Sequence, residues 1–214
     1  MSAAMTTFNA APWDSRYGAE SFFYGSEPND FLREKAPLLA AGSDVLCLAE
    51  GEGRNAVFLA TLGHRVTGVD ASPVGLAKAQ RLAAERGTTL TTEVADLADF
   101  DLGDARWDAV VSIWCHLPAA MRPSMHGRIA RAMRTGGLVL FEHYHPRQLD
   151  YRTGGPPDAA MLLTLDELRR DFSGFDVVHA WEGERPIVEG TGHKGTSYVT
   201  QFVARKSPST SASA

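Results

Sequence analysis

The sequence predicts an α/β protein with one doubly wound, mostly parallel seven-stranded sheet, helices on both faces and an antiparallel pair of strands at its C-terminal side. Three observations support this prediction. Short apolar runs alternate with helical patterns five times between residues 44 and 142. The last two apolar runs are joined by a polar connection in which no helix fits, so they are expected to pair antiparallel. The length of 214 residues suits one domain, at about 150 residues per domain.

Each expected strand is a short apolar run that stops at a polar or glycine residue, as buried parallel strands do. The first run, DVLCLA, stops before a Glu-Gly-Glu-Gly turn, the second stops at Asp70, and the third, rich in threonine, closes at Asp96. The expected strands are residues 44–49, 64–69, 88–95, 108–114, 138–142, 175–182 and 196–204.

Each expected helix carries a start or stop signal. Ser72 and Pro73 suit the N-cap and first turn of the second helix, which Gly87 ends. Thr164 and Glu167 have the spacing of a capping box for the last helix. The expected helices are residues 54–62, residue 73 to Gly87, residue 123 to the Gly136-Gly137 pair, and residues 165–172.

The composition is that of an ordinary globular protein and disfavours several classes. Asp and Glu outnumber Lys and Arg by 26 to 21, a formal net charge of −5, which disfavours nucleic-acid binding. No run approaches the ~18 apolar residues of a membrane span, and the first dozen residues lack the regions of a signal peptide, so a cytoplasmic protein is expected. Cys47 and Cys115 lie in apolar runs and are expected to be buried free thiols. Residues 1–12 are expected to be flexible and residues 207–214 disordered, around a domain of residues 13–206.

The strand ends hold the candidate binding residues, because ligands of doubly wound sheets bind at the carboxyl ends of the strands. The Gly-Glu-Gly turn at 51–53 precedes a helix whose free N–H groups favour a carboxylate or a phosphate. Asp70, 19 residues after Gly51, suits the hydroxyl groups of a ribose. Asp96 can accept a hydrogen bond from an adenine amino group, and Leu97 can cover the ring.

These features fit more than one nucleotide-type ligand. With Ala56, the turn fits the G-x-G-x-x-A pattern, so an NAD(P)-dependent oxidoreductase is one alternative, although the Tyr-x-x-x-Lys pair of short-chain dehydrogenases is missing. A non-catalytic module that binds an adenosyl ligand is another. The sequence has no G-x-x-x-x-G-K-[ST] loop, H-E-x-x-H motif, cysteine cluster or G-x-S-x-G motif, and no metal site is expected.

Four motifs, in order along the chain, resemble class I S-adenosylmethionine-dependent methyltransferases. They are VLCLAEGEGRN at 45–55, VDASP at 69–73, ADL at 95–97 and Gly136-Gly137. The Gly-Arg-Asn sequence and WDSRY at 13–17 resemble the tellurite-resistance-type and thiopurine-methyltransferase-like branch. The resemblance covers residues 13–206. It implies a Rossmann-like methyltransferase fold, S-adenosylmethionine as cofactor and S-adenosylhomocysteine as product.

The resemblance also implies where the cofactor lies. The implied binding residues are Trp13, Arg16, Ala49, Glu50, Gly51, Gly53, Asp70, Ala71, Asp96, Leu97, Ile113 and Trp114. By the resemblance, the turn residues Ala49 to Gly53 bind the methionine end of the cofactor. Asp70 and Ala71 bind the ribose, and Asp96 and Leu97 flank the adenine. Ile113 and Trp114, at the end of the fourth strand, lie near the sulfonium. Arg16 pairs with the methionine carboxylate. The family has an acid where this chain has Cys47 and a glycine where it has Ala49, so Glu50 is the candidate for the negative charge.

The expected methyl acceptor is a small molecule with a soft or anionic group, such as a thiol, a chalcogen oxyanion or a halide. The variable segments around its pocket are rich in Arg, His and Lys, which suits such a group. The candidate substrate residues are Tyr17, Cys115, His143, His145, Arg147 and Arg152. His116 is the candidate general base, because the reference pKa of histidine is ~6.5, whereas a thiolate, selenide or halide needs no base. Residues 144–158 are long for a loop and are a candidate lid.

Other acceptors fit the sequence less well. A protein or nucleic-acid methyltransferase is disfavoured by the acidic balance and by the lack of an added recognition domain. The expected partners are therefore a small-molecule acceptor, with no nucleic acid and no membrane, and the expected assembly is a monomer or a homodimer.

Overall fold

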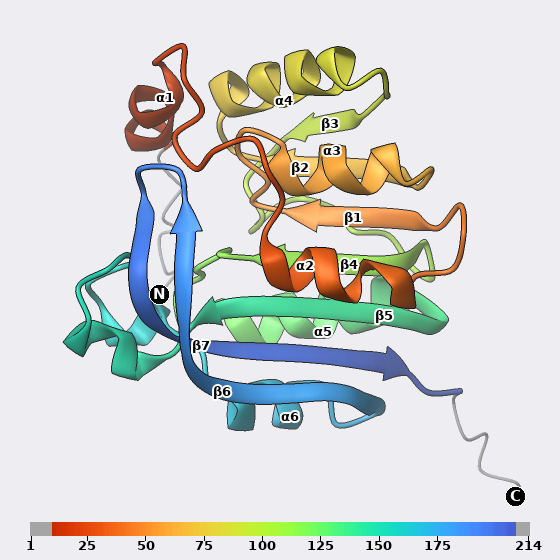
Figure 1. Cartoon of the computed structure of the whole chain (residues 1–214). Helices are drawn as coiled ribbons and strands as arrows, with labels where there is room; N and C mark the ends of the chain where they lie inside the picture. The colour runs from red at the N-terminus through yellow and green to blue at the C-terminus, as the bar shows by residue number, and fades with distance from the viewer. Residues whose placement is uncertain (1–9, 209–214) are drawn as a thin grey trace, which may run out of the picture.

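A seven-stranded sheet forms the centre of the computed structural model, which describes residues 10–208 (Figure 1). The strands lie in the order β3-β2-β1-β4-β5-β7-β6. They are β1 (Asp44–Leu48), β2 (Arg65–Asp70), β3 (Thr91–Val94), β4 (Trp107–Ile113), β5 (Met133–Tyr144), β6 (Phe175–Glu189) and β7 (His193–Lys206). Strands β1 to β5 are parallel, and β7 is antiparallel to both β5 and β6. The predicted fold class is confirmed.

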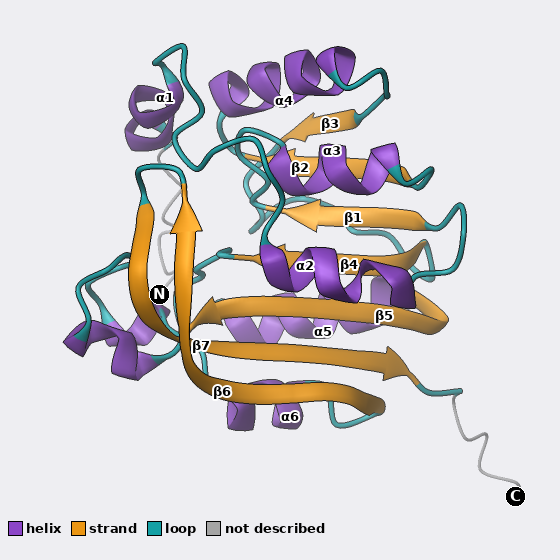
Figure 2. Ribbon diagram, viewed as in Figure 1, coloured by secondary structure: helices purple, strands orange, loops and turns teal. Residues whose placement is uncertain are grey.

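Helices cover both faces of the sheet, with α2, α3 and α4 on one face and α5 and α6 on the other (Figure 2). The helices are α1 (Ala11–Tyr17), α2 (Asp30–Lys35), α3 (Arg54–Thr61), α4 (Pro73–Glu85), α5 (Arg122–Ala132) and α6 (Leu165–Asp171), with short 3-10 turns η1 (Ala36–Leu38), η2 (Pro146–Asp150) and η3 (Ala159–Met161). Each face has its own apolar core. Successive strand residues point to opposite faces, so the neighbours Val45 and Leu46 belong to different cores.

The start signals in the sequence form the caps that they predict. Ser72 Oγ accepts a hydrogen bond from the N–H of Gly75 at 3.0 Å, at the start of α4. Thr164 and Glu167 make both bonds of the capping box that opens α6. Cys47 and Cys115 are buried free thiols, as predicted.

The end of the α5 helix differs from the prediction. The helix ends at Ala132, and the Gly136-Gly137 pair lies within β5 instead of closing the helix. The chain is already extended at Met133, which pairs with Trp107 of β4. A Cβ on Gly137 would lie 2.8 Å from the carbonyl oxygen of Asp108, so this glycine allows close strand approach rather than a helix cap.

The last two strands are longer than predicted and form one continuous hairpin. Pairing extends to Glu189 and His193, so the polar connection expected between residues 182 and 196 is wrong. Figure 1 shows the distal half of this hairpin turning away from the sheet and crossing its carboxyl edge toward α1. We call this half, residues 183–199, the hairpin arm. It buries polar side chains, such as Glu189 and His193, as well as the apolar Ile187 and Val199. Its sequence therefore lacks the regular apolar alternation on which strand prediction depends.

Two short N-terminal helices, α1 and α2, were not predicted, and α1 begins inside the segment expected to be flexible. Of the two predicted flexible ends, residues 1–9 and 209–214 lie outside the described residues. Within residues 10–208, no helix is both long and apolar enough to cross a membrane.

Candidate functional site

The turn after β1 has a backbone that favours glycine. Ala49, Gly51 and Gly53 have φ angles of 49°, 58° and 90°, all in the left-handed region. A Cβ on Gly53 would collide with the side chain of Ala79, so only glycine lets α4 pack here. Ala49 stands where the resemblance expects glycine and has the conformation that glycine adopts, at a cost on the order of 1 kcal/mol.

The carboxylate of Glu50 caps the start of α3. Its Oε1 accepts hydrogen bonds from the N–H groups of Asn55 (3.1 Å) and Ala56 (2.7 Å), a place where a helix favours negative charge. Its aliphatic part packs against Gly68 of β2. Burial raises the pKa of Glu50 to about 7 in spite of the two bonds. The proposed contact of this carboxylate with a ligand ammonium group stays a prediction.

Asp70 ends β2 and ties the turn to the start of α4. Its Oδ2 accepts from the N–H of Gly51 and its Oδ1 from the N–H of Ser72, both at 2.8 Å. A carboxylate has about four acceptor sites, so capacity remains for ligand hydroxyl groups. Burial raises the pKa of Asp70. Ala71, the next predicted residue, is half-buried beside it.

The segment after β3 lies next to Asp70, because Val94 pairs with Asp70 across the sheet. Asp96 is half-buried and its Oδ1 accepts from the N–H of Ala98 at 2.9 Å, while Leu97 is buried. Arg128 of α5 donates to the carbonyl oxygen of Leu97 at 2.9 Å. The structure thus brings the predicted ribose and adenine residues to one edge of the sheet.

Residues 10–24, which we call the N-terminal strap, lie over the turn. Tyr17 is buried, and a Cβ on Gly51 would lie 2.7 Å from its hydroxyl oxygen. Trp13 stacks on Tyr17 with ring centroids 5.9 Å apart. The Arg16 guanidinium lies 4.6 Å from the centroid of the Trp13 ring and donates to the Tyr24 hydroxyl at 3.0 Å. Tyr17 therefore lies against the glycine turn, with Trp13 and Arg16 beside it. The roles expected of these three residues in binding cofactor and substrate stay predictions.

A buried ion pair that the sequence analysis missed holds this strap. Lys78 of α4 pairs with Glu52 of the glycine turn, and both side chains are almost fully buried. The Lys78 ammonium also donates to three strap carbonyls, those of Tyr17 (3.3 Å), Ala19 (2.9 Å) and Ser21 (2.7 Å). Glu52 Oε2 accepts from the N–H of Phe23 at 2.8 Å. No local pattern marks these contacts, because Lys78 follows a regular helical spacing.

Aromatic rings gather beyond the end of β4. Trp114 follows the buried Ile113 and has a left-handed φ of 57°. Its ring stacks on Tyr144 with centroids 4.4 Å apart, and His116 stacks on Tyr144 at 5.6 Å and 10°. His143 meets His116 edge-on at 5.4 Å. We call Trp114, His116 and Tyr144 the aromatic cluster.

Two members of the aromatic cluster have buried polar atoms with no hydrogen-bond partner in the described structure. They are both ring nitrogens of His116 and the hydroxyl group of Tyr144. Burial lowers the pKa of His116 to about 3, so its imidazole is neutral near pH 7 and is a weak base. Unpaired buried polar groups are uncommon in proteins, so these atoms are candidates for hydrogen bonds to a ligand or to an ordered water. Tyr144 was not among the predicted residues, although it directly follows His143 at the end of β5.

The remaining predicted substrate residues divide between two places. Cys115 and His143 line a cavity on the α5 face of the sheet, and His143 Nε2 lies 3.0 Å from Ser112 Oγ. The others, His145, Arg147 and Arg152, lie on the loop after β5, whose Gly154 and Gly155 pack against the Tyr144 ring. In that loop His145 caps η2 through the N–H of Arg147 (3.1 Å), and Arg152 is exposed.

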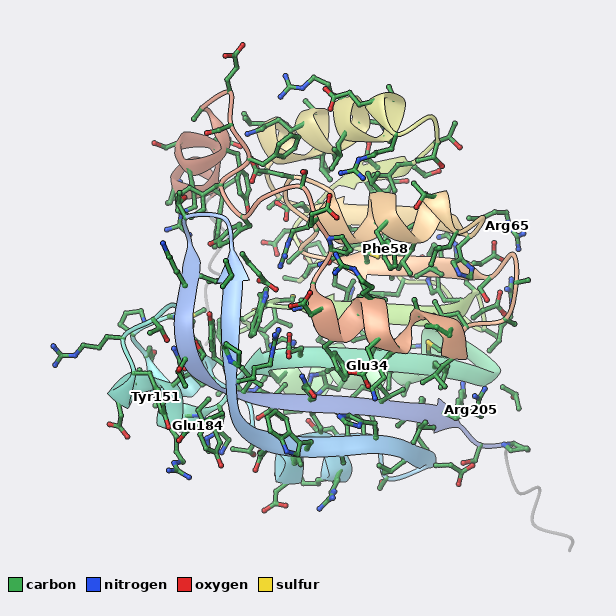
Figure 3. The ribbon with its side chains drawn as sticks, viewed as in Figure 1. Glu34, Phe58, Arg65, Tyr151, Glu184 and Arg205 are labelled. Carbon is green, nitrogen blue, oxygen red and sulfur yellow. The ribbon has the colours of Figure 1, made fainter. Side chains whose placement is uncertain are left out.

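The loop at 144–158 is attached to the hairpin arm. Figure 3 shows Tyr151 and Glu184 lying together, and the Tyr151 hydroxyl donates to Glu184 at 2.6 Å. The Arg147 guanidinium lies 4.3 Å from the ring centroid of Tyr198. The predicted lid movement of this loop stays a prediction.

Two buried glutamates, Glu142 and Glu189, lie under the aromatic cluster. Asn29 donates to both, at 2.5 and 2.8 Å, and Arg185 donates to Glu142 at 2.8 and 2.7 Å. Glu142 ends an apolar strand, which marks it in the sequence, whereas nothing near Glu189 does. Among residues 10–208 no three His, Cys, Asp or Glu side chains are grouped so as to hold a metal ion.

Comparisons with known proteins find similarity to methyltransferases. Residues 45–137 match a family described as "Methyltransferase domain". The 2-heptyl-1-hydroxyquinolin-4(1H)-one methyltransferase of Mycobacteroides abscessus is 35% identical over 156 residues, which cover 70% of this chain and 65% of that protein. The demethylmenaquinone methyltransferase of Tropheryma whipplei is 31% identical over 111 residues, or 51% of this chain. The chain spans 65% and 46% of the lengths of these two relatives.

Solved structures share the fold. A structure that describes conversion of a disulfide bond into a thioacetal group during echinomycin biosynthesis has a TM-score of 0.73 at 23% identity, covering 95% of this chain and 92% of that one. TehB from Haemophilus influenzae has a TM-score of 0.69 at 18% identity, covering 91% and 65%. Magnesium protoporphyrin IX methyltransferase from Synechocystis PCC 6803, with bound SAH, has a TM-score of 0.64 at 20% identity, covering 83% and 82%. These likenesses show the Rossmann-like methyltransferase fold.

Proposed function

We propose that the protein is an S-adenosylmethionine-dependent methyltransferase that acts on a small molecule. The observation that carries the proposal is the meeting, at one edge of the sheet, of the left-handed glycine turn, Asp70 and Asp96. The match of residues 45–137 to the methyltransferase domain supports it. An NAD(P)-dependent oxidoreductase is less well supported, because the named relatives are methyltransferases.

The residues present fit the cofactor. Ala49 has the backbone of a glycine at the position where the family has one, and Asp70 has acceptor capacity for two ribose hydroxyl groups. The glycine turn and Arg16 would bind the methionine end of the cofactor. Asp96 and Leu97 would contact the adenine, and Ile113 and Trp114 would lie near the sulfonium. When bound, the cofactor supplies an activated methyl group that a nucleophile displaces in line.

The aromatic cluster is the proposed acceptor site. Its stacked rings favour a flat ring, and the unpartnered His116 nitrogens favour an acceptor with an ionisable hydroxyl or thiol group. The name of the mycobacterial relative, whose acceptor is a hydroxylated quinolone ring, supports this choice. The proposal also includes smaller soft acceptors, namely simple thiolates, chalcogen oxyanions and halides. The assignment to the tellurite-resistance-type branch is part of the same proposal.

In the proposed mechanism the chain mainly positions the acceptor and excludes water, which can contribute about 7–11 kcal/mol through effective molarity. The neutral imidazole of His116 accepts a hydrogen bond from the hydroxyl or thiol of the acceptor. It takes the proton as the acceptor atom bonds to the methyl group, because the positive charge that develops on that atom makes its proton strongly acidic. The Tyr144 hydroxyl donates a hydrogen bond to the acceptor. The strap, through Tyr17, covers the turn and keeps water from the methionine end.

The first experiment measures cofactor binding. Thermal unfolding is followed with S-adenosylhomocysteine, NAD and NADP in turn, for the wild type and for Asp70→Asn. S-adenosylhomocysteine at about 100 times Kd should add ~2.7 kcal/mol of stability, and Asp70→Asn should reduce this gain. Stabilisation by a nicotinamide cofactor alone, or by none of the three, would contradict the proposal.

The second experiment tests the acceptor. Methyl transfer is measured over a panel of hydroxyquinolones, thiophenols, simple thiols, selenite and iodide. For acceptors that are protonated at the assay pH, His116→Phe should lower kcat by about 10²-fold or more, with little effect on acceptors that are already ionised. The control is His179→Phe, on β6 and away from the cluster. Equal losses for both acceptor types would exclude His116 as the base.

A further inference from the structure

Trp114 is held in an unusual backbone conformation by bonds at both ends of the residue. Its φ of 57° is rare for a bulky residue. Its backbone N–H donates to the carbonyl oxygen of Glu142 at 2.9 Å, and its indole Nε1–H donates to Glu189 Oε2 at 2.7 Å. The second bond fixes how the indole ring is turned, and therefore how it stacks on Tyr144.

Glu189 reaches this place from the end of β6, 75 residues further along the chain than Trp114. Its carboxylate also accepts from Arg54 Nη2 at 2.7 Å and from Asn29 Nδ2 at 2.8 Å, and lies 3.2 Å from His193 Nδ1. Donors from four separate parts of the chain thus converge on one carboxylate that is 7% exposed. A charged acceptor with several donors makes stronger hydrogen bonds than a neutral one.

The hairpin arm is itself fixed to the N-terminal strap. The N–H of Thr191, at the tip of the arm, donates to the carbonyl oxygen of Phe23 at 2.8 Å. His193 packs edge-on against both Trp114 and Tyr144, with centroids 5.2 and 5.3 Å away. The arm therefore contributes a second side to the aromatic cluster, and Glu189 is the polar link between them.

We infer that Glu189 is a positioning residue of the acceptor site: its carboxylate orients the Trp114 indole, one of the rings on which the acceptor is proposed to lie. The role of Glu189 in acceptor binding rests on the proposed function, whereas its contact with the Trp114 indole can be tested without it. Glu189 touches Trp114, Arg54, Asn29 and His193, and it acts on the acceptor through Trp114.

The test follows the indole N–H signals of 15N-tryptophan-labelled protein, in which Trp114→Phe assigns the Trp114 signal. In Glu189→Ala the Trp114 signal should move and exchange with solvent about tenfold faster or more, because its acceptor is lost. Glu189→Gln keeps a carbonyl oxygen and should restore part of the protection. The indole of Trp107, which donates to the carbonyl of Leu102, reports that each variant is folded. An unchanged Trp114 signal in a folded Glu189→Ala protein would overturn the inference.

The matched control is Glu184→Ala, on the same arm, because Glu184 contacts Tyr151 and not the aromatic cluster. All indole signals should stay unchanged in it. With an acceptor from the panel, Glu189→Ala should lower kcat about tenfold, and the loss should largely vanish in the Trp114→Phe background. Independent, additive losses would also overturn the inference. If the protein bound no S-adenosylhomocysteine, the proposed function would fail while the indole measurement still decided the role of Glu189.

Discussion

At the scale of single residues, the ionisation of Glu50 in the glycine turn makes the folding stability of the protein depend on pH. Its pKa of about 7 lies above the ordinary value of 4.5, so the folded protein favours the protonated carboxyl. Ionising it therefore costs folding free energy. The favourable contribution is complete below pH 4.5, and it is lost as the pH rises to about 7.

Glu50→Gln mimics the protonated form and keeps an oxygen that can cap α3. We expect this variant to be more stable than the wild type above pH 7, and the two proteins to have the same stability near pH 4.5. Urea unfolding at several pH values between these limits measures the difference. Glu93→Gln, at an exposed position on β3, is the control and should show no such divergence. A constant difference at all pH values would contradict the assigned pKa.

The site residues that could be predicted from the sequence are those that follow the ends of successive strands. Gly51 and Asp70 follow successive parallel strands, so they must meet at one edge, and they do, at 2.8 Å. Lys78 and Glu189 could not be predicted in this way. Their partners lie as far as 61 and 160 residues away, and each is surrounded by ordinary helix or strand sequence.

At the scale of elements, the N-terminal strap depends on one buried ion pair. Lys78→Met removes the charge at nearly constant volume and leaves Glu52 unpaired, with three strap carbonyls lacking their donor. We expect a loss of about 3–5 kcal/mol of stability and faster proteolytic cleavage within residues 17–24.

Urea unfolding and limited proteolysis with mass spectrometry test this expectation. The double variant Lys78→Met/Glu52→Gln should recover part of the stability, because it removes the unpaired buried charge. Arg81→Ala, on the exposed side of α4, should leave both measurements unchanged. Unchanged cleavage of the strap in Lys78→Met would show that other contacts hold it.

Helices and strands were predictable where the sequence has a regular apolar pattern or a clear capping residue. Strands β1 and β4 are apolar on both sides, and α4 has a cap at its start, so their positions were close to those observed. Residues 183–195 of the hairpin arm were missed because buried polar side chains, such as Glu189 and His193, interrupt the apolar pattern of the strands. The helices α1 and α2 were missed because they have seven and six residues, too few for a periodic pattern.

At the scale of the whole molecule, the two ends of the chain close the carboxyl edge of the sheet together. The strap binds the glycine turn through Glu52, and the hairpin arm binds the strap at Phe23 and the aromatic cluster at Trp114. The strap and the arm thus form the two halves of a cover over the proposed cofactor and acceptor sites, and they meet where residues 190–193 pack on Phe23 and Tyr24. Weakening the contact between the strap and the arm should lower the hydrogen-exchange protection of both segments together.

Gly190, at the tip of the arm, is the place to test this coupling. It has a φ of 57°, and a Cβ there would collide with the backbone of Phe23 and Gly25. We expect Gly190→Ala to raise amide hydrogen exchange in residues 21–29 and in residues 186–195 together, with the central strands unchanged. Gly63→Ala is the matched control, because Gly63 also has a positive φ, 87°, but a Cβ there meets nothing within 4 Å. It should cost only local backbone strain of about 1 kcal/mol and leave both segments protected. Faster exchange in the arm alone would show that the strap is held by Lys78 and Glu52 without help from the arm, and that the two halves of the cover open independently.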